Sequence, residues 1–127
     1  MSDHTLPSDA ELRILQALWD HPGSTVQEVH AWGEQAGVDV GYTTVLTQLQ
    51  RMHKKALVTR ERRGRQHHYH AALGRDVTEA ALVARLSESA FAGSAVRLAL
   101  KALGNDRPSA ADLEALEQWI KAQKDKS

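Results

Sequence analysis

The chain has 127 residues, no cysteine, and 16 Lys and Arg against 16 Asp and Glu, so its formal net charge is zero. Without cysteine it can form neither a disulfide nor a thiolate metal site, and no apolar run approaches the roughly 18 residues of a membrane-spanning helix. The first eleven residues lack the basic and apolar segments of a signal peptide. We therefore expect a soluble, cytoplasmic protein of one domain, or of a small domain with an appendage.

Charge is distributed unevenly along this neutral chain. Residues 1–40 carry one basic and seven acidic side chains, whereas residues 41–70 carry seven basic and one acidic, a net charge of +6. Residues 71–127 hold eight of each sign. A neutral protein that collects its positive charge in one short segment has a binding surface for a polyanion.

Two helices are predicted before the basic segment. Ser8 and Glu11 have the spacing of a capping box, and the apolar stripe that follows them runs to a Pro-Gly pair that ends the helix. Thr25 and Glu28 form a second capping box, and Gly37 provides a left-handed exit from the second helix. We therefore expect two helices that precede a third, as in a helix-turn-helix.

The third predicted helix, residues 42–55, opens the basic segment. Val45, Leu49 and Met52 recur at helical spacing and are expected to face inward. The opposite side is polar at its start and basic at its end, and such side chains can read base edges and hold phosphates. That outward stripe consists of Thr43, Thr47, Gln50 and Lys54, with Arg51 beside them.

Two strands, Val58–Arg63 and Gln66–Ala71, are predicted around Gly64. Alternation places Val58 and Tyr69 inward, and the arginines gather near the tip of the hairpin, where solvent or a phosphate is their only expected neighbour. A helix followed at once by a basic hairpin is the layout of a winged helix-turn-helix. The predicted DNA contacts are Tyr42, Thr43, Thr44, Thr47, Gln50, Arg51, Lys54, Arg62, Arg63 and Arg65.

The second strand also carries three histidines, of which His68 and His70 share a face and His67 lies opposite. Two histidines without carboxylate or thiolate neighbours are a thin ligand set for a metal. Packing on the wing is therefore the favoured interpretation, and no metal or other cofactor is predicted.

Residues 75–127 are predicted to form three helices, the first capped by Asp76 and the second closed by Gly104. So short a segment cannot easily bury its apolar side chains alone, so a core shared between two copies is favoured over packing on the chain's own N-terminal part. The fold class is thus mainly α, with a winged-helix domain at residues 1–74 and a dimerisation domain at 75–127. The predicted dimerisation residues are Val83, Leu86, Phe91, Val96, Leu98, Leu100, Leu103, Leu113, Leu116, Trp119 and Ile120.

A family resemblance rests on three stretches of the chain: ELRILQALWDHPGSTVQEV, TTVLTQLQRMHKKALVTRERRGRQHHYHA and FAGSAVRLALKAL. Together they resemble the penicillinase-repressor family of winged-helix transcriptional regulators (BlaI/MecI/CopY type). The resemblance implies a homodimeric bacterial repressor that binds a double-stranded DNA operator with dyad symmetry. In antibiotic-responsive members, a membrane-bound sensor metalloprotease cleaves the C-terminal domain, which implies such a partner encoded nearby.

Two departures from that family bear on regulation. The copper-responsive branch carries cysteine pairs near its C-terminus and this chain has none, which excludes copper-thiolate sensing. The β-lactam branch is cut at an Asn–Phe step, whereas the aligned residues here are Lys101-Ala102. The protease has a different preference, or the protein is regulated in another way.

The sequence leaves three other classes of function to compare. One is a winged-helix sensor of a small ligand or metal, with His68 and His70 as ligands, and another is a winged helix used only for contact with proteins. The third is an enzyme, which is disfavoured because the sequence has no nucleophile elbow, no phosphate-cradling glycine loop and no clustered carboxylates.

Overall fold

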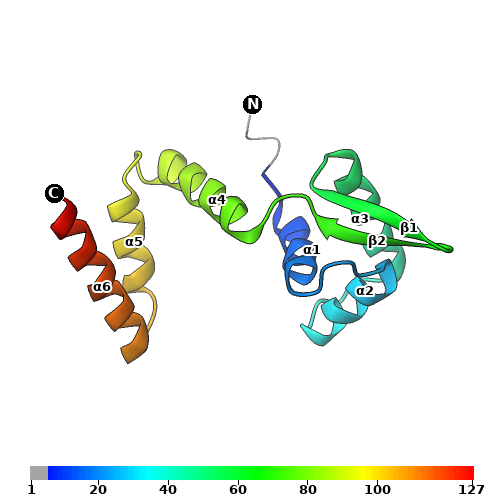
Figure 1. The fold of residues 1–127 in the computed structure, drawn as a ribbon, viewed down its shortest axis with the longest axis horizontal. Coiled ribbons are helices and arrows are strands. Elements are labelled where there is room, and N and C mark those ends of the chain that lie inside the picture. Colours follow the sequence, from blue (N-terminus) through cyan, green and yellow to red (C-terminus); the bar gives the residue numbers. More distant parts are fainter. Residues whose placement is uncertain (1–5) are drawn as a thin grey trace. The chain divides into compact units, whose positions relative to one another are not determined.

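In a computed structural model, residues 6–127 are described, and they form six helices and one antiparallel two-stranded sheet (Figure 1). The first compact unit ends at Val83 and the second is Ala84–Ser127, so the fourth helix begins in one unit and ends in the other. The predicted class, a mainly α chain with a winged helix, is confirmed. The elements are α1 (Asp9–Asp20), α2 (Val26–Gln35), α3 (Tyr42–Lys54), β1 (Val58–Arg63), β2 (Gln66–Ala71), α4 (Arg75–Ala90), α5 (Ala95–Gly104) and α6 (Ala110–Lys126).

Both predicted capping boxes at the start of the chain are present. The Ser8 hydroxyl accepts a hydrogen bond from the Glu11 amide at 3.2 Å, and the Glu11 carboxylate accepts one from the Ser8 amide at 2.9 Å. Thr25 and Glu28 repeat the arrangement at α2. Gly37 follows α2 with φ +82°, the left-handed exit expected there.

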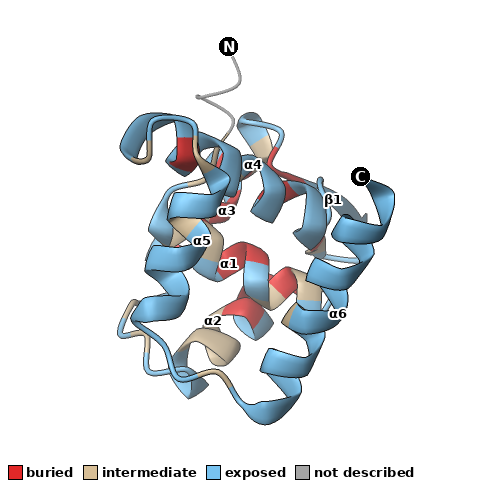
Figure 2. Ribbon diagram, turned by 90° about the vertical axis from the view of Figure 1, so that its left-hand side faces the viewer, coloured by how far each residue is buried: buried red, intermediate tan, exposed pale blue. Residues whose placement is uncertain are grey.

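The core lies in the first unit, where α1, α2, α3 and the hairpin meet (Figure 2). Leu18, Leu49, Met52, Val58 and Tyr69 are its largest fully buried side chains. The inward stripe predicted for α3 is therefore confirmed, as are the two inward positions predicted for the hairpin. Since one side of α3 fills the core, its other side is left for a partner.

The hairpin is held at both its ends. Gly64 turns the chain with φ +63°, a left-handed backbone that favours glycine, and the paired register runs from Val58 opposite Ala71 to Arg63 opposite Gln66. Tyr69 exchanges two backbone hydrogen bonds of 2.9 Å with the turn between α1 and α2, donating to Ser24 and accepting from Gly23. The base of the wing is thus fixed to the helices beneath it.

The C-terminal helices differ from prediction at two ends. Asp76 was expected to cap α4, but α4 begins at Arg75, so Asp76 lies inside the first turn. Gly104 was expected to close α5, but it lies within that helix, and Asn105 is the C-cap. In α6 the capping box of Ser109 and Asp112 forms as the pattern indicated.

Most residues of the second unit are exposed, as the colour of α5 and α6 shows (Figure 2), and Phe91, Leu98 and Leu116 are half-buried. Within Ala84–Ser127, all of it described, Ser87 is the only buried residue. Val96, Leu100 and Trp119 are 68%, 65% and 63% exposed. Burying such side chains is favourable by about 1.5–3 kcal/mol each, so this unit exposes a surface suited to a partner.

Candidate nucleic-acid interface

The outward face of α3 is open to a ligand. Tyr42, Thr43 and Thr44 at its start are exposed, as are Gln50, Arg51 and Lys54 further along, while Thr47 is half-buried. The N-cap of α3 is Gly41, which has no side chain to bond the first amides of the helix. Those amides can donate to an anion such as a phosphate.

The three wing arginines predicted to contact DNA are all exposed, but their local partners differ. Arg62 donates from Nε to the Gly64 carbonyl at 3.1 Å, and Arg63 forms an ion pair with Glu61. Arg65 has no hydrogen-bond or ion-pair partner within residues 6–127. Of the three, Arg65 is therefore the cation most available to a phosphate.

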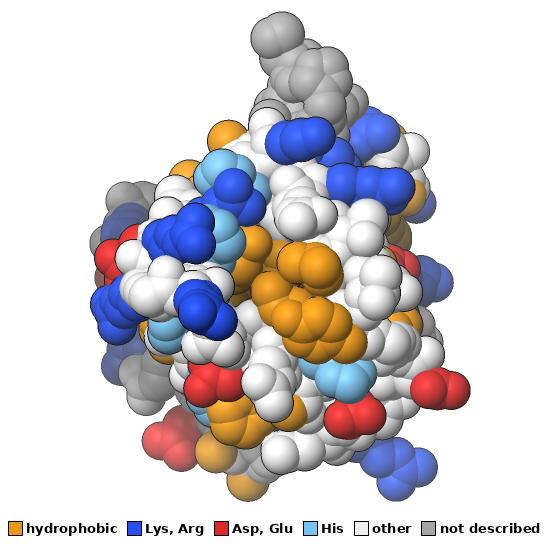
Figure 3. Space-filling model, turned by 90° about the vertical axis from the view of Figure 1, so that its right-hand side faces the viewer, with side chains coloured by type: hydrophobic (Ala, Val, Ile, Leu, Met, Phe, Trp, Pro, Cys, Tyr) orange, Lys and Arg blue, Asp and Glu red, His pale blue; other side chains and the backbone are white. Residues whose placement is uncertain are grey.

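A hollow of about 260 Å³ separates α3 from the wing. It brings Gln50 of α3 beside Arg65 at the tip, so a predicted base-reading residue and a predicted phosphate contact border the same space. Figure 3 shows this side of the molecule, with Lys and Arg side chains gathered beside and above an apolar patch. The lining also includes residues that sequence reasoning did not assign to DNA: Gln27, Arg60, Gln66 and His67.

His67 is the clearest of these missed residues. Its Nδ1 is buried without a hydrogen-bond partner among the described residues, and burial, followed by the positive charges of Arg60 and Arg62 and by His53, lowers its pKa below the ordinary 6.5. Strand pairing sets Arg62 opposite His67 and Arg60 opposite Tyr69, on the face that carries Val58. Alternation from the inward Val58 and Tyr69 could have grouped Arg60, Arg62 and His67 on one face, and the strand register adds that Arg62 lies directly opposite His67.

Comparison with known proteins identifies the family to which this winged-helix chain belongs. A sequence model described as penicillinase repressor matches residues 7–122. The chain belongs to the penicillinase repressor family. Two relatives, each named transcriptional regulator BlaI, come from Mycobacterium tuberculosis strains CDC 1551 / Oshkosh and ATCC 25618 / H37Rv. Each is 38% identical to this chain over 96 residues, covering 74% of this chain and 69% of the relative.

Membership of the penicillinase repressor family makes this chain a transcriptional regulator of the repressor type, with DNA as its partner. Such regulators are generally not enzymes. None of the helices in the described part of the chain is long and apolar enough to cross a membrane.

The histidines considered as metal ligands have other contacts. His68 and His70 share a strand face as predicted, but His68 Nδ1 lies 2.8 Å from the Gly23 carbonyl oxygen, and His70 Nε2 lies 4.0 Å from a Glu61 carboxylate oxygen. Within residues 6–127 no three metal-binding side chains come together. These contacts attach β2 to the turn before α2 and to its partner strand.

Proposed function

We propose that two copies of this chain form a repressor that binds a dyad-symmetric operator, with one α3 in the major groove of each half-site. Thr43, Thr47 and Gln50 would meet base edges, where glutamine pairs with adenine and a threonine methyl contacts the thymine methyl. Tyr42 and Thr44 would lie near the backbone at the start of α3. The binding of RNA polymerase would be blocked by occlusion.

The observation that carries this proposal is the shared surface of α3 and the wing. Gln50 of the polar stripe and Arg65 at the wing tip line one hollow, and the stripe and the tip are otherwise exposed apart from the half-buried Thr47. The exposed cations predicted to contact DNA all belong to the +6 segment of the sequence: Arg51, Lys54, Arg62, Arg63 and Arg65. Hydrogen-bonding groups beside phosphate-binding cations match what a duplex presents.

The apolar surface of the second unit supports dimerisation through residues 75–127. On α5, Val96, Leu100 and Leu103 recur at helical spacing and are 37% to 68% exposed. On α6, Leu113, Trp119 and Ile120 are 46% to 63% exposed. In a homodimer, the exposed apolar residues of α5 and α6 pack against the same residues of the second copy. The dimer then presents two winged helices to one duplex.

Relief of repression by a membrane-bound sensor metalloprotease that cleaves the second unit is part of the same proposal. The aligned step, Lys101-Ala102, is exposed on α5, so a protease that accepts this sequence could reach it when the helix opens. Cleavage there would divide the apolar surface and weaken the dimer. A cytoplasmic location follows from DNA as the target.

The test begins by selecting duplexes from a random-sequence pool with the purified full-length protein. Paired half-sites whose centres lie one or more helical turns apart, in steps of about 10 bp, are expected. With six to ten phosphate contacts, log K plotted against log salt should fall with a slope of roughly −5 to −9. A pool with no paired sites, or binding that ignores salt, would refute the proposal.

A matched pair of variants on α3 tests the groove contact itself. Gln50→Ala removes the glutamine that lines the hollow beside the wing, and should change the base preferred at one position of each half-site. Loss of a bidentate contact costs about 1–3 kcal/mol of discrimination. Gln48 lines a different pocket, between α1, α2 and α3, so Gln48→Ala should leave the base preference unchanged.

A further inference from the structure

The segment that leads into α4 is joined to the end of α1 by several contacts. The Trp19 indole N–H donates to the Leu73 carbonyl at 3.0 Å. Two residues on, the Arg75 guanidinium lies 2.8 Å from an Asp20 carboxylate oxygen and 5.4 Å from the centre of the Trp19 ring. Three different interactions thus hold one short stretch of chain against one helix end.

The two charges of this contact lie at helix ends that oppose them. Asp20 is an anion in the last turn of α1, where the helix dipole is negative, and Arg75 is a cation in the first turn of α4, where it is positive. Each placement is unfavourable for an isolated helix. Each helix alone would favour a charge of the opposite sign at that end. The ion pair between Asp20 and Arg75 therefore explains why both charges stand where they do.

The chain around this contact is held as well. The Ala72 amide, just after β2, donates to the Leu57 carbonyl at 2.9 Å, and Thr78 in the first turn of α4 is 6% exposed. Leu15, Leu57, Val77 and Thr78 line a cavity of only about 60 Å³. The first turn of α4 therefore lies against α1 and against Leu57, between α3 and β1.

The direction of α4 matters because the helix is long. From Arg75 to Ala90 it has 16 residues, or about 24 Å at 1.5 Å per residue. A tilt of about 10° at its start moves its far end by roughly 4 Å, which is about the 3.4 Å rise per base pair along the DNA axis. A small change in the angle of α4 thus moves its far end by about the length of one base pair.

We propose that Trp19, Asp20 and Arg75 are positioning residues that set which operator half-site spacing the dimer accepts. The inference rests on the proposed binding of a dimer to paired half-sites. These residues lie away from the α3 stripe and the wing, so they affect the spacing between half-sites and leave the reading of each half-site to α3.

The test uses full-length protein and duplexes that carry two copies of the selected half-site at a series of spacings, together with a duplex that carries one half-site. Asp20→Asn and Trp19→Phe each remove one contact with little change of shape. Each should lower the preference for the best spacing over its neighbours by about fivefold or more, a typical coupling, while affinity for the single half-site stays unchanged. Arg13→Gln, an exposed charge on the same α1, should change neither quantity.

Exchange of the two charges provides the rescue. Asp20→Arg combined with Arg75→Asp restores the ion pair and also places each charge at the helix end that favours it. The double variant should recover the spacing preference that Asp20→Asn loses. Native spacing preference in both single variants, or loss of single half-site affinity in them, would overturn the inference. A native protein that favours no paired site would instead refute the proposed function itself, and the inference with it.

Discussion

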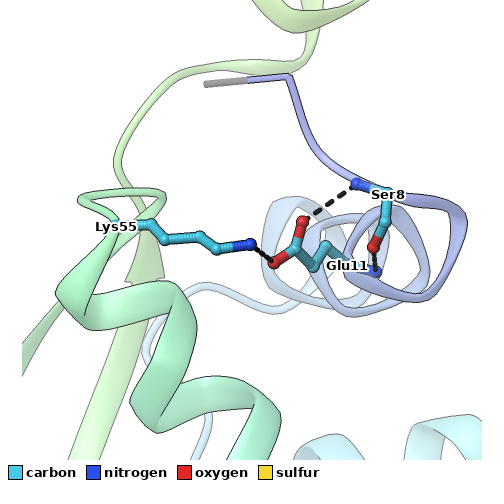
Figure 4. Close-up of polar contacts among 3 residues, drawn as sticks. All are labelled: Ser8, Glu11 and Lys55. Carbon is cyan, nitrogen blue, oxygen red and sulfur yellow. Dashed lines mark hydrogen bonds and ion pairs between the residues drawn. The ribbon is translucent and has the colours of Figure 1, made fainter. Parts of the chain in front are cut away.

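Glu11 of α1 and Lys55, the C-cap residue of α3, form an ion pair in which Lys55 Nζ lies 2.9 Å from Glu11 Oε2 (Figure 4). The other carboxylate oxygen of Glu11 accepts from the Ser8 amide and closes the capping box. One side chain, only 8% exposed, therefore starts the first helix and holds the end of the third. It connects the beginning of the domain to the helix proposed to enter the groove.

Glu11→Gln separates the two roles, because glutamine at this position can still close a capping box but cannot form an ion pair. We expect the free energy of unfolding to fall by about 1 kcal/mol, or roughly 4–8 °C in Tm for a domain of this size. Glu28→Gln provides the control, since Glu28 occupies the same capping position in α2 and has no ion pair within residues 6–127. Equal effects of the two substitutions would contradict a stabilising role for the Lys55 contact.

The same variant has a predicted pH dependence. Burial alone would raise the pKa of Glu11, but hydrogen bonds from Lys55 and from the Ser8 amide, together with the Lys55 charge, lower it below its usual 4.5. A depressed carboxyl pKa stabilises the folded state above the unfolded value, and that stabilisation is lost as pH falls through the folded value. The Tm difference between the native protein and Glu11→Gln should therefore be constant near neutral pH and shrink below about pH 4.5.

Local sequence patterns predicted the helices and strands well where the determinants are themselves local. Both N-terminal capping boxes lie within three residues, and Gly64 alone marks the turn of the hairpin. The pair of Lys55 with Glu11 joins residues 44 positions apart, and no spacing rule anticipates it. Asp76 was predicted to cap α4, which instead begins at Arg75, and the Arg75 pair with Asp20 joins residues 55 positions apart that no spacing rule connects.

A second prediction distinguishes the wing arginines by their local partners. Arg65→Gln removes a cation without a partner in the described chain, whereas Arg63→Gln removes one already paired with Glu61. One lost phosphate contact per subunit should flatten the slope of log K against log salt by about 2 for a dimer. We expect that change for Arg65→Gln and a smaller one for Arg63→Gln, measured by titration of the selected operator at several salt concentrations. An unchanged slope in both variants would remove the wing tip from the interface.

A third prediction concerns His67 and pH. In the free protein, burial, Arg60, Arg62 and His53 lower its pKa. A DNA phosphate in the adjacent hollow would offset those positive charges and raise the pKa, so binding would take up a proton. Operator affinity should therefore increase as pH falls below about 6.5, the ordinary value for histidine.

His67→Gln should remove most of this pH dependence while keeping affinity near neutral pH. His21→Gln is the matched control, since the His21 ring stacks on Trp32 with 3.8 Å between ring centroids and does not line the hollow. Titrations of the selected operator between pH 5.5 and 8 by fluorescence anisotropy, a range of roughly one unit or more around the ordinary histidine pKa, make the comparison. If His67→Gln and native protein share one pH profile, no phosphate binds beside this side chain.

The last prediction tests the exposed apolar surface of the second unit. Leu100 is 65% exposed on α5, in line with Val96 and Leu103, so a dimer that covers this stripe buries two copies of it. At about 2 kcal/mol for each leucine, Leu100→Gln should weaken dimerisation by about 4 kcal/mol, or roughly a thousandfold. Sedimentation equilibrium measures the change, and Lys121→Gln, an exposed polar position on α6, should leave the dimer intact. Because the proposed repressor binds two half-sites at once, the Leu100→Gln protein should also lose operator affinity while its salt-dependent binding to nonspecific DNA persists. A variant that remains a dimer at the same concentration would show that some other surface joins the two copies.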